Sequence, residues 1–304
     1  MAITRVSTAA AFQNTIRDFT GLQAESARIS EQISSGKKAS TFIELNSDIR
    51  QVLDFESSIR TIDGFVDSNN IVVSRLGVMD NAVNQIYNIL ADMKQNIIAE
   101  GTNPNQIDLT SLARSALEQV ASNLDVQQSG RYLFSGSKIT TPPSGNIVDF
   151  SNIDTNGNVD ASYYQGDGLK FTVNANDQLN VEYGITGDNA AFQNAFASLH
   201  SAIAADDTGG ASSVQLQNAQ DLIDISLDQI LSLRSQIGTD SGILEGANIQ
   251  HERVKIQVEG QLSDIISTDI AEATIRQSLN QTTLQATLQS FVRISELKLS
   301  DFLR

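Results

Sequence analysis

The chain contains no cysteine and no tryptophan among its 304 residues. Without cysteine there is no disulfide, no thiol nucleophile and no cysteine-ligated metal, which excludes several classes of enzyme. Proline is almost as scarce, and the only three are Pro104, Pro142 and Pro143. Because proline is the strongest helix breaker, long helices are permitted towards both ends of the chain.

Basic residues are also few, with 20 lysines and arginines against 36 acidic residues and a formal net charge of -16. Such a chain is repelled by polyanions, so we expect neither a nucleic-acid partner nor binding to an anionic membrane. No apolar run reaches the ~20 residues of a transmembrane helix, and residues 1–12 lack the basic and hydrophobic segments of a secretory signal. The sequence therefore predicts a soluble protein without an ordinary secretory signal.

Apolar residues in the first part of the chain recur at spacings of three and four, as in amphipathic helices. The first stripe covers residues 12–33 and ends at Gly36. A second covers 49–97 and keeps its period for about seven heptads, which predicts a helix of ~75 Å at ~1.5 Å per residue. A third stripe, at 109–124, is expected to fold back on the second.

The character of the sequence changes between residues 131 and 187, where glycine, asparagine and aspartate separate short alternating runs. We expect a small β-rich insert there, with a hairpin turn at 174–177. Helical spacing returns at 192–203 and 216–237. A further long stripe then runs from 244 to 297 and mirrors the one near the N-terminus.

Two long stripes at opposite ends of one chain can be buried only by pairing with each other or with another chain. The predicted fold class is therefore mainly α, with elongated helical coiled-coil rods formed by both termini and a small β-rich inserted outer domain. In this division an N-terminal assembly helix at 1–45 pairs with 266–304, a helical rod at 46–136 pairs with 188–265, and 137–187 forms the outer domain. A compact helical bundle is the alternative, although long rods match a single globular core of this size poorly.

Motifs that carry chemistry are scarce. His200 and His251 lie far apart in predicted helices, and the second histidine of a zinc-binding helix is missing after His251. Two Ser-x-x-Lys patterns, at 34–37 and 135–138, lack the companion Lys-Thr-Gly motif and are interpreted as helix or strand terminators. A phosphate-binding Gly-x-x-x-x-Gly-Lys loop is also absent. The sequence thus predicts neither an enzyme nor a bound cofactor.

One segment, at 152–160, alternates oxygen-bearing residues and places glycine at its sixth position, as calcium loops do. Its twelfth residue is Tyr163 in place of the bidentate glutamate, so calcium would bind weakly. Asparagine, aspartate and glycine are also the ordinary residues of turns. We predict a turn and no metal site, with calcium as the alternative.

Both ends of the chain resemble one family. Residues 5–8 (Arg-Val-Ser-Thr) and 33–37 (Ile-Ser-Ser-Gly-Lys) are similar to the opening of flagellar hook-associated proteins, and the second motif is also similar to flagellins. At the other end, 284–289 (Leu-Gln-Ala-Thr-Leu-Gln) and 295–303 (Ser-Glu-Leu-Lys-Leu-Ser-Asp-Phe-Leu) resemble the other terminus of the same group. The two matches occur in the right order.

Two internal motifs separate members of this group. Residues 130–136 (Gly-Arg-Tyr-Leu-Phe-Ser-Gly) and 164–167 (Tyr-Gln-Gly-Asp) resemble the start, and a strand, of the outer domain of hook-filament junction proteins. Flagellins more often begin with an Ile-Asn-Thr-Asn type motif, which is missing here. The Pro-Phe pair expected soon after Lys138 is replaced by Pro142-Pro143, a departure from the family pattern in the insert.

The resemblance implies a structural protein that is exported unfolded through the flagellar channel and polymerises as a short layer between hook and filament. The partners it implies are further copies of the chain in a helical homo-oligomer, other hook-associated proteins, flagellin and an export chaperone. Flagellin itself is the nearest alternative. An adhesin with its activity in the insert and an extracellular enzyme are two others.

We expect the terminal segments, at about 1–45 and 266–304, to bury too little apolar surface alone and to become ordered when neighbouring subunits complete the coiled coil. Head-to-tail contacts of this kind are heterologous, which is the geometry of a helical tube. The predicted assembly interface consists of apolar residues of the two terminal stripes: Ile16, Phe19, Ile29, Ile33, Leu284, Leu288, Phe291, Ile294, Leu297 and Phe302.

Overall fold

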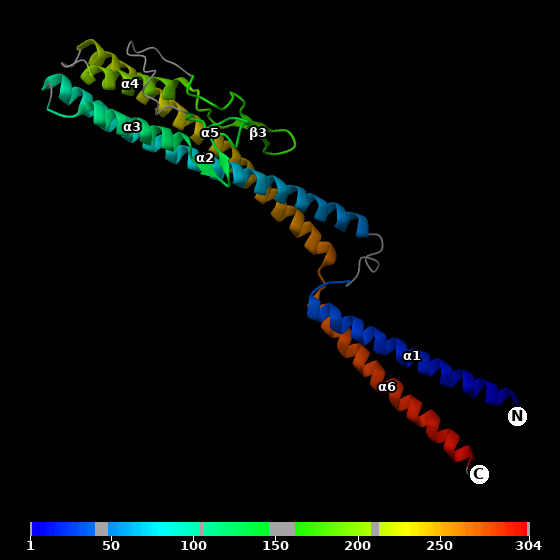
Figure 1. Cartoon of the computed structure of the whole chain (residues 1–304). Coiled ribbons are helices and arrows are strands. Elements are labelled where there is room, and N and C mark those ends of the chain that lie inside the picture. The colour runs from blue at the N-terminus through cyan, green and yellow to red at the C-terminus, as the bar shows by residue number, and fades with distance from the viewer. Residues whose placement is uncertain (1, 40–47, 104–105, 146–161, 208–212, 303–304) are drawn as a thin grey trace. The chain divides into compact units, whose positions relative to one another are not determined.

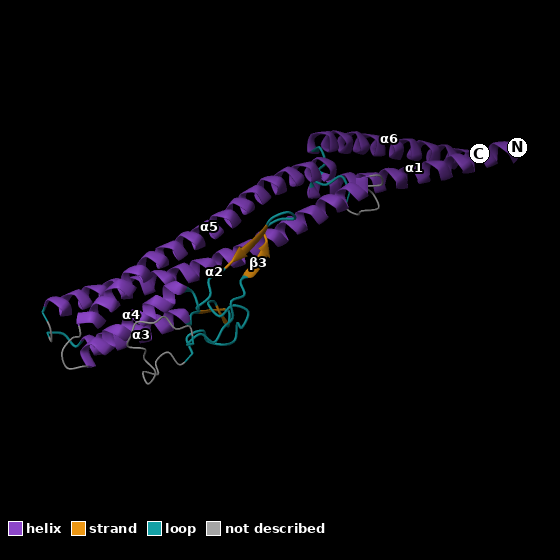
Figure 2. Ribbon diagram, turned by 90° about the horizontal axis from the view of Figure 1, so that it is seen from above, coloured by secondary structure: helices purple, strands orange, loops and turns teal. Residues whose placement is uncertain are grey.

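The computed structural model describes residues 2–39, 48–103, 106–145, 162–207 and 213–302, and the side chains at 2–9, 11–12, 206–207, 213 and 294–302 lie outside this description. The helices among the described residues are α1 (Ala2–Ser35), α2 (Ile49–Thr102), α3 (Leu109–Leu124), α4 (Ala190–Asp207), α5 (Ser213–Ile266) and α6 (Ile270–Phe302) (Figure 1). The strands are short: β1 (Gln127–Gln128), β2 (Arg131–Tyr132), β3 (Phe171–Asn174) and β4 (Asn180–Tyr183). The predicted mainly α fold with a small β-rich insert is confirmed (Figure 2).

Helix α5 is longer than the sequence pattern indicated. The pattern gave two stripes, at 216–237 and from 244 onwards, but one helix covers both and includes Gly238 and Gly242 between them. A glycine inside a helix costs only about 1 kcal/mol relative to alanine. The turns beside these glycines are held by packing, because Ile237 and Leu244 are buried. None of the helices in the described ranges has a stretch long and apolar enough to cross a membrane.

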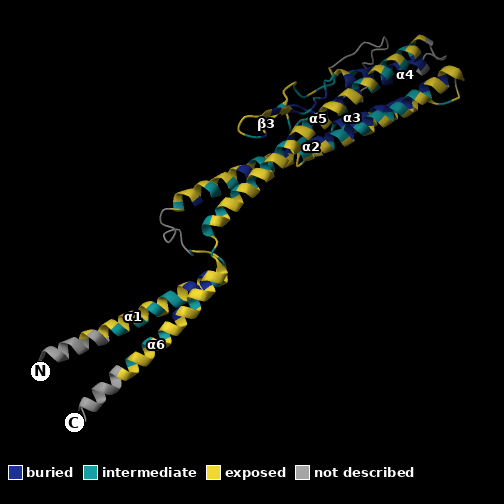
Figure 3. Ribbon diagram, turned by 180° about the vertical axis from the view of Figure 1, so that it is seen from behind, coloured by how far each residue is buried: buried dark blue, intermediate teal, exposed yellow. Residues whose placement is uncertain are grey.

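By its internal contacts the chain divides into two units, which are described one at a time: residues 62–253, and residues 1–61 together with 254–304. In the larger unit, α2, α3, α4 and α5 share one apolar core with the β3–β4 hairpin. Figure 3 shows the buried residues gathered where these four helices lie together. The heptad pattern of α2 supplies one wall of this core, since Leu76, Val83, Ile86 and Leu90 have no exposed surface.

The β3–β4 hairpin is fastened to two long helices. Its turn lies where the sequence placed it, and the carboxamide oxygen of Asn176 accepts hydrogen bonds from two backbone N–H groups of the turn at 2.9 and 2.8 Å. The neighbouring residue Ala175 is buried. Its carbonyl oxygen accepts a hydrogen bond from Asn69 Nδ2 of α2 at 3.2 Å and lies 2.7 Å from His251 Nε2 of α5. The insert therefore packs as part of the larger unit.

The two internal motifs of the insert bind each other. The carboxylate of Asp167 accepts hydrogen bonds from the hydroxyl of Ser137 and from the backbone N–H groups of Ser137 and Leu169, the last two at 2.8 and 3.2 Å. These bonds favour the charged form and so lower the pKa of the Asp167 carboxyl. Gly136 lies opposite with a φ of 63°, and a Cβ there would collide with the Asp167 backbone. Residues 164–167, expected as a strand, form an irregular loop because their partners lie in this facing loop.

The candidate calcium segment at 152–160 lies outside the described residues. Its expected twelfth position is described, and the Tyr163 hydroxyl donates a hydrogen bond to the carbonyl oxygen of Gly187 at 2.6 Å. The Tyr163 ring packs edge-on against Phe196 of α4. Tyr163 thus has a packing role in the core of the larger unit.

Candidate assembly interface

In the smaller unit, α1 and α6 pack side by side and run antiparallel (Figure 1). The least exposed positions of each helix recur at alternating spacings of three and four, as in a two-stranded coiled coil. In α1 they include Thr15, Phe19, Leu22, Ser26, Ile29 and Ile33. In α6 they are Ala273, Gln277, Asn280, Leu284, Thr287 and Phe291. These two rows form the seam between the helices.

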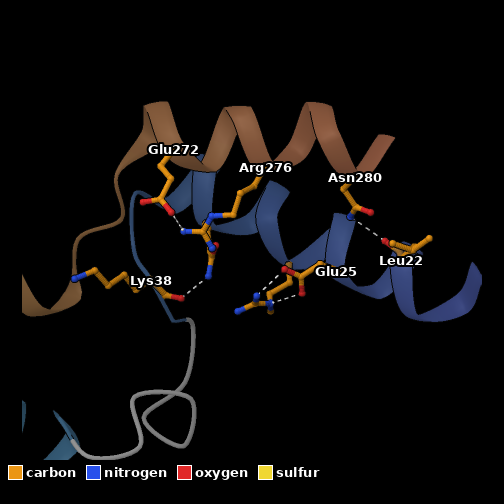
Figure 4. Close-up of polar contacts among 8 residues, drawn as sticks. Leu22, Glu25, Lys38, Glu272, Arg276 and Asn280 are labelled. Carbon is orange, nitrogen blue, oxygen red and sulfur yellow. Dashed lines mark hydrogen bonds and ion pairs between the residues drawn. The ribbon is translucent and has the colours of Figure 1, made fainter. Parts of the chain in front are cut away.

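At the base of the seam, the segment that follows α1 pairs with the segment between α5 and α6. The backbone N–H of Lys38 donates to the carbonyl oxygen of Ile266 at 2.7 Å, and that of Thr268 donates to Gly36 at 2.9 Å. Gly36 has a φ of 70°, so it ends α1 in the left-handed conformation that glycine adopts most readily. The carboxamide of Gln32 closes the base by donating to the Lys38 carbonyl oxygen at 2.6 Å (Figure 4).

The middle of the seam is polar. Gln277 Nε2 donates to the hydroxyl of Ser26 at 3.0 Å. Asn280 Nδ2 donates to the carbonyl oxygen of Leu22 at 3.0 Å, as Figure 4 shows. Asn280 is only 8% exposed, yet its Oδ1 atom has no hydrogen-bond partner among the described residues. A buried asparagine in a helical seam fixes the register of the pair and lowers its stability. The polar middle of the seam therefore gives the pair specificity at a cost in stability.

Charged side chains flank this polar part of the seam. Arg28 donates two hydrogen bonds to the Glu25 carboxylate, at 2.9 and 2.7 Å. The bonds from Arg28, with a smaller contribution from the nearby Arg276 of α6, lower the pKa of the Glu25 carboxyl. Arg276 itself pairs with Glu272 at 2.9 Å (Figure 4). These ion pairs are largely exposed and contribute little to stability.

Asn280→Leu is expected to strengthen the α1–α6 pair, because it replaces a buried and partly unsatisfied amide with an apolar side chain. A gain of about 1 kcal/mol would slow amide hydrogen exchange in α1 roughly fivefold. Exchange measured by mass spectrometry on the purified chain checks this. Gln281→Leu is the control, since Gln281 is exposed. Faster exchange in Asn280→Leu would show that the asparagine is a net stabiliser of the pair.

Towards the chain termini the seam opens into an apolar hollow of about 140 Å³. The hollow is lined by Thr15, Ile16, Phe19, Thr287, Leu288 and Phe291. Ile16 and Leu288 are 42% and 46% exposed at its rim. The two helices alone therefore leave apolar surface of the seam in contact with water.

The predicted interface residues fall into three groups. Ile16, Phe19, Leu288 and Phe291 line the hollow. Ile29, Ile33 and Leu284 lie in the closed part of the seam, where Ile29 is only 2% exposed. Ile294, Leu297 and Phe302 belong to α6, and their side chains lie outside the described residues. Sequence reasoning missed the exposed residues Ile275 and Leu279 of α6, which a search for a second stripe would have found.

The two histidines have structural surroundings. The His251 ring stacks on Phe65 with ring centroids 5.4 Å apart, and it holds the β3–β4 turn as described above. His200 lies in α4, and burial lowers the pKa of its imidazole. No cluster of three or more histidine, aspartate or glutamate side chains that could hold a metal ion occurs within the described ranges.

Known proteins resemble this chain in sequence and in fold. The family described as the bacterial flagellin N-terminal helical region matches residues 6–139. Flagellar hook-associated protein 3 of Escherichia coli (strain K12) is 25% identical over 320 aligned positions, which cover 97% of this chain and 98% of the relative. Two crystal structures share the fold. FlgL of Bacillus cereus has a TM-score of 0.54 at 15% identity and covers 70% of this chain and 99% of its own. Hook-associated protein 3 of Legionella pneumophila has a TM-score of 0.54 at 18% identity, with coverages of 69% and 98%.

The paired terminal helices, the family match and the shared fold define a flagellin-like helical protein. Within this class the chain is similar to hook-associated protein 3, the FlgL type, since the relative of that name aligns over nearly the whole of both chains at 25% identity. The resemblance noted in the two terminal sequences is thereby confirmed. Bulk flagellin, the alternative, fits less well, because the relative that aligns over nearly the whole of both chains is a hook-associated protein.

Proposed function

We propose that this chain is a structural protein of the bacterial flagellum that joins hook to filament by helical polymerisation through its terminal helices. It acts by association and carries out no catalysis. One observation carries the proposal, namely the apolar hollow at the open end of the α1–α6 seam. Apolar surface left in water at the seam of a weakly held helix pair is what a neighbouring subunit would cover.

The proposed mechanism couples ordering of the terminal helices to assembly. The α1–α6 pair has a polar middle and an open end, so it gains little from burial of apolar surface in the free chain. A neighbouring subunit that fills the hollow supplies the missing contacts. The assembly interface in this proposal is the set of ten apolar residues predicted from the sequence. The division into 1–45 with 266–304, 46–136 with 188–265, and 137–187 is part of the same proposal.

The partners follow from this role. The chain would bind further copies of itself, other hook-associated proteins and flagellin, and an export chaperone would hold it before assembly. We propose export through the flagellar channel without a cleaved signal peptide. The formal net charge of -16 argues against partners that are nucleic acids or anionic membranes. The proposed function requires no cofactor.

Limited proteolysis of the purified chain at low concentration is expected to trim it from both ends and to leave the larger unit intact. The reason is that the terminal pair opens more often than the apolar core of residues 62–253. Mass spectrometry of the fragments identifies the cut sites. Assembly into flagella should protect the same sites. If the free chain resisted digestion at both ends, ordering on assembly would be wrong.

Antibody labelling of purified flagella tests the location independently. Label confined to a thin band between hook and filament is the expected result. Label along the whole filament would instead show that the chain is a bulk flagellin. Flagella without any label would contradict the proposed function.

A further inference from the structure

Helix α6 carries a second apolar surface that its seam with α1 does not use. Ile275 and Leu279 are 69% and 67% exposed and lie about one turn apart. At 3.6 residues per turn they lie roughly 120–160° around the helix from the seam positions. Nothing among the described residues covers them.

Charge is missing from the part of α6 that contains Leu279 and begins two residues after Ile275, beyond the Glu272–Arg276 ion pair. Residues 277–292 contain no lysine, arginine, aspartate or glutamate, whereas residues 13–35 of α1 contain five of them. In a chain with a net charge of -16, two copies repel each other over most of their surfaces. The uncharged part of α6 is where a second copy can approach without this repulsion. A helix that is apolar on several sides is normally buried on several sides.

The hollow opens on the opposite flank of α6. Leu288 at its rim and Val292 beyond it are 46% and 51% exposed, and both point roughly 60–100° from the seam in the direction away from Ile275 and Leu279. The volume of the hollow is about 140 Å³. An apolar cavity of roughly 150 Å³ accepts a benzene-sized group, so this hollow has room for a leucine or isoleucine side chain.

We propose that Ile275 and Leu279 of one copy insert into the hollow between α1 and α6 of the next copy. This inference rests on the proposed function and names the two surfaces that meet. Because the inserted residues and the hollow are different surfaces of the same unit, the contact is heterologous and leaves one of each free after every addition. Repetition of the contact extends the array without closing a dimer. The occupant of the hollow is thus a second copy of this chain.

Introduced cysteines test the contact directly, since the chain has no cysteine of its own. Cells that lack the native protein would express two variants together, Leu279→Cys and Ile16→Cys. Flagella are then purified, mildly oxidised and run on a non-reducing gel. The expected product is a disulfide-linked pair at twice the 32.8 kDa chain mass. In the control Ser30→Cys replaces Ile16→Cys, because Ser30 is exposed on α1 and does not line the hollow.

At least tenfold more linked pair from Leu279→Cys with Ile16→Cys than from the control supports the contact. Incorporation of both variants into flagella with no excess of linked pair overturns it and leaves the proposed function intact. Absence of the wild-type chain from purified flagella overturns the proposed function and this contact with it. Leu279→Lys adds a second measurement: the melting temperature of the purified chain should stay unchanged while incorporation falls at least tenfold, and normal incorporation would contradict the proposal.

Discussion

Replacing Phe291 with aspartate is expected to keep the chain out of flagella while leaving the larger unit as stable as in the wild type. Phe291 lies on the wall of the hollow, opposite Phe19 and Ile16 of α1. In the free chain this position is partly open, so a carboxylate there can stay hydrated. In the proposed assembly a neighbouring subunit fills the hollow, and the carboxylate would lose water without gaining a partner. That loss costs several kcal/mol, and about 3 kcal/mol already weakens association more than a hundredfold.

Two measurements are needed for this variant: thermal unfolding of the purified chain, and incorporation into flagella of cells that lack the native protein. Leu169→Asp is the matched control, since Leu169 is 63% exposed in the larger unit and lies outside the hollow. The control should be incorporated normally. A lower melting temperature of the main transition in Phe291→Asp would place Phe291 in a core of the free chain and favour the compact bundle. Normal incorporation would show that the hollow is not an assembly surface.

Local periodicity was enough to predict helices α2 and α3. The stripe expected at 49–97 corresponds to α2 (Ile49–Thr102), and the stripe at 109–124 to α3 with the same bounds. A helix that is buried on one side has an apolar residue at every third or fourth position, so this pattern can be read from a single sequence. The end of α1 was also predictable, because Gly36 marks it in the sequence and adopts a positive φ in the structure. The turn of the β3–β4 hairpin was predictable for a similar reason, because asparagine is a typical turn residue.

Contacts between distant segments could not be predicted from such patterns. Lys38 is hydrogen-bonded to Ile266, and Ser137 to Asp167. In both cases the sequence around one residue gives no indication of which distant residue it binds. Residues 164–167 were expected as a strand from their resemblance to the family, and their short polar sequence does not reveal that they bind a facing loop. The hollow could not be predicted either. The sequence shows which apolar residues lie in the seam, but not where the two helices fail to close against each other. Ile275 and Leu279 were overlooked because only one stripe was sought on α6.

Truncating Phe134 is expected to have the largest effect on the stability of the free chain. Its side chain has no exposed surface, and its ring meets Phe192 of α4 edge-on with centroids 5.9 Å apart. Its backbone carbonyl oxygen also accepts hydrogen bonds from the N–H of Gly187 at 2.8 Å and the hydroxyl of Tyr164 at 3.0 Å. Phe134 therefore connects the start of the insert to the helical core of the larger unit.

Phe134→Ala removes a buried ring and leaves a cavity, which lowers the free energy of unfolding by about 3–5 kcal/mol and the Tm by on the order of 10 °C. Leu169→Ala is the control within the insert and should change stability by less than about 0.5 kcal/mol, because Leu169 is largely exposed. Unfolding is followed by circular dichroism for the helices and by tyrosine fluorescence for the insert, in a Tyr87→Phe, Tyr132→Phe background that leaves only Tyr163, Tyr164 and Tyr183 of the insert. Since Ala175, Val181 and Tyr183 of the insert belong to the same buried cluster as the helices, both signals should shift together. A shift in tyrosine fluorescence alone would mean that residues 137–187 unfold as a domain of their own.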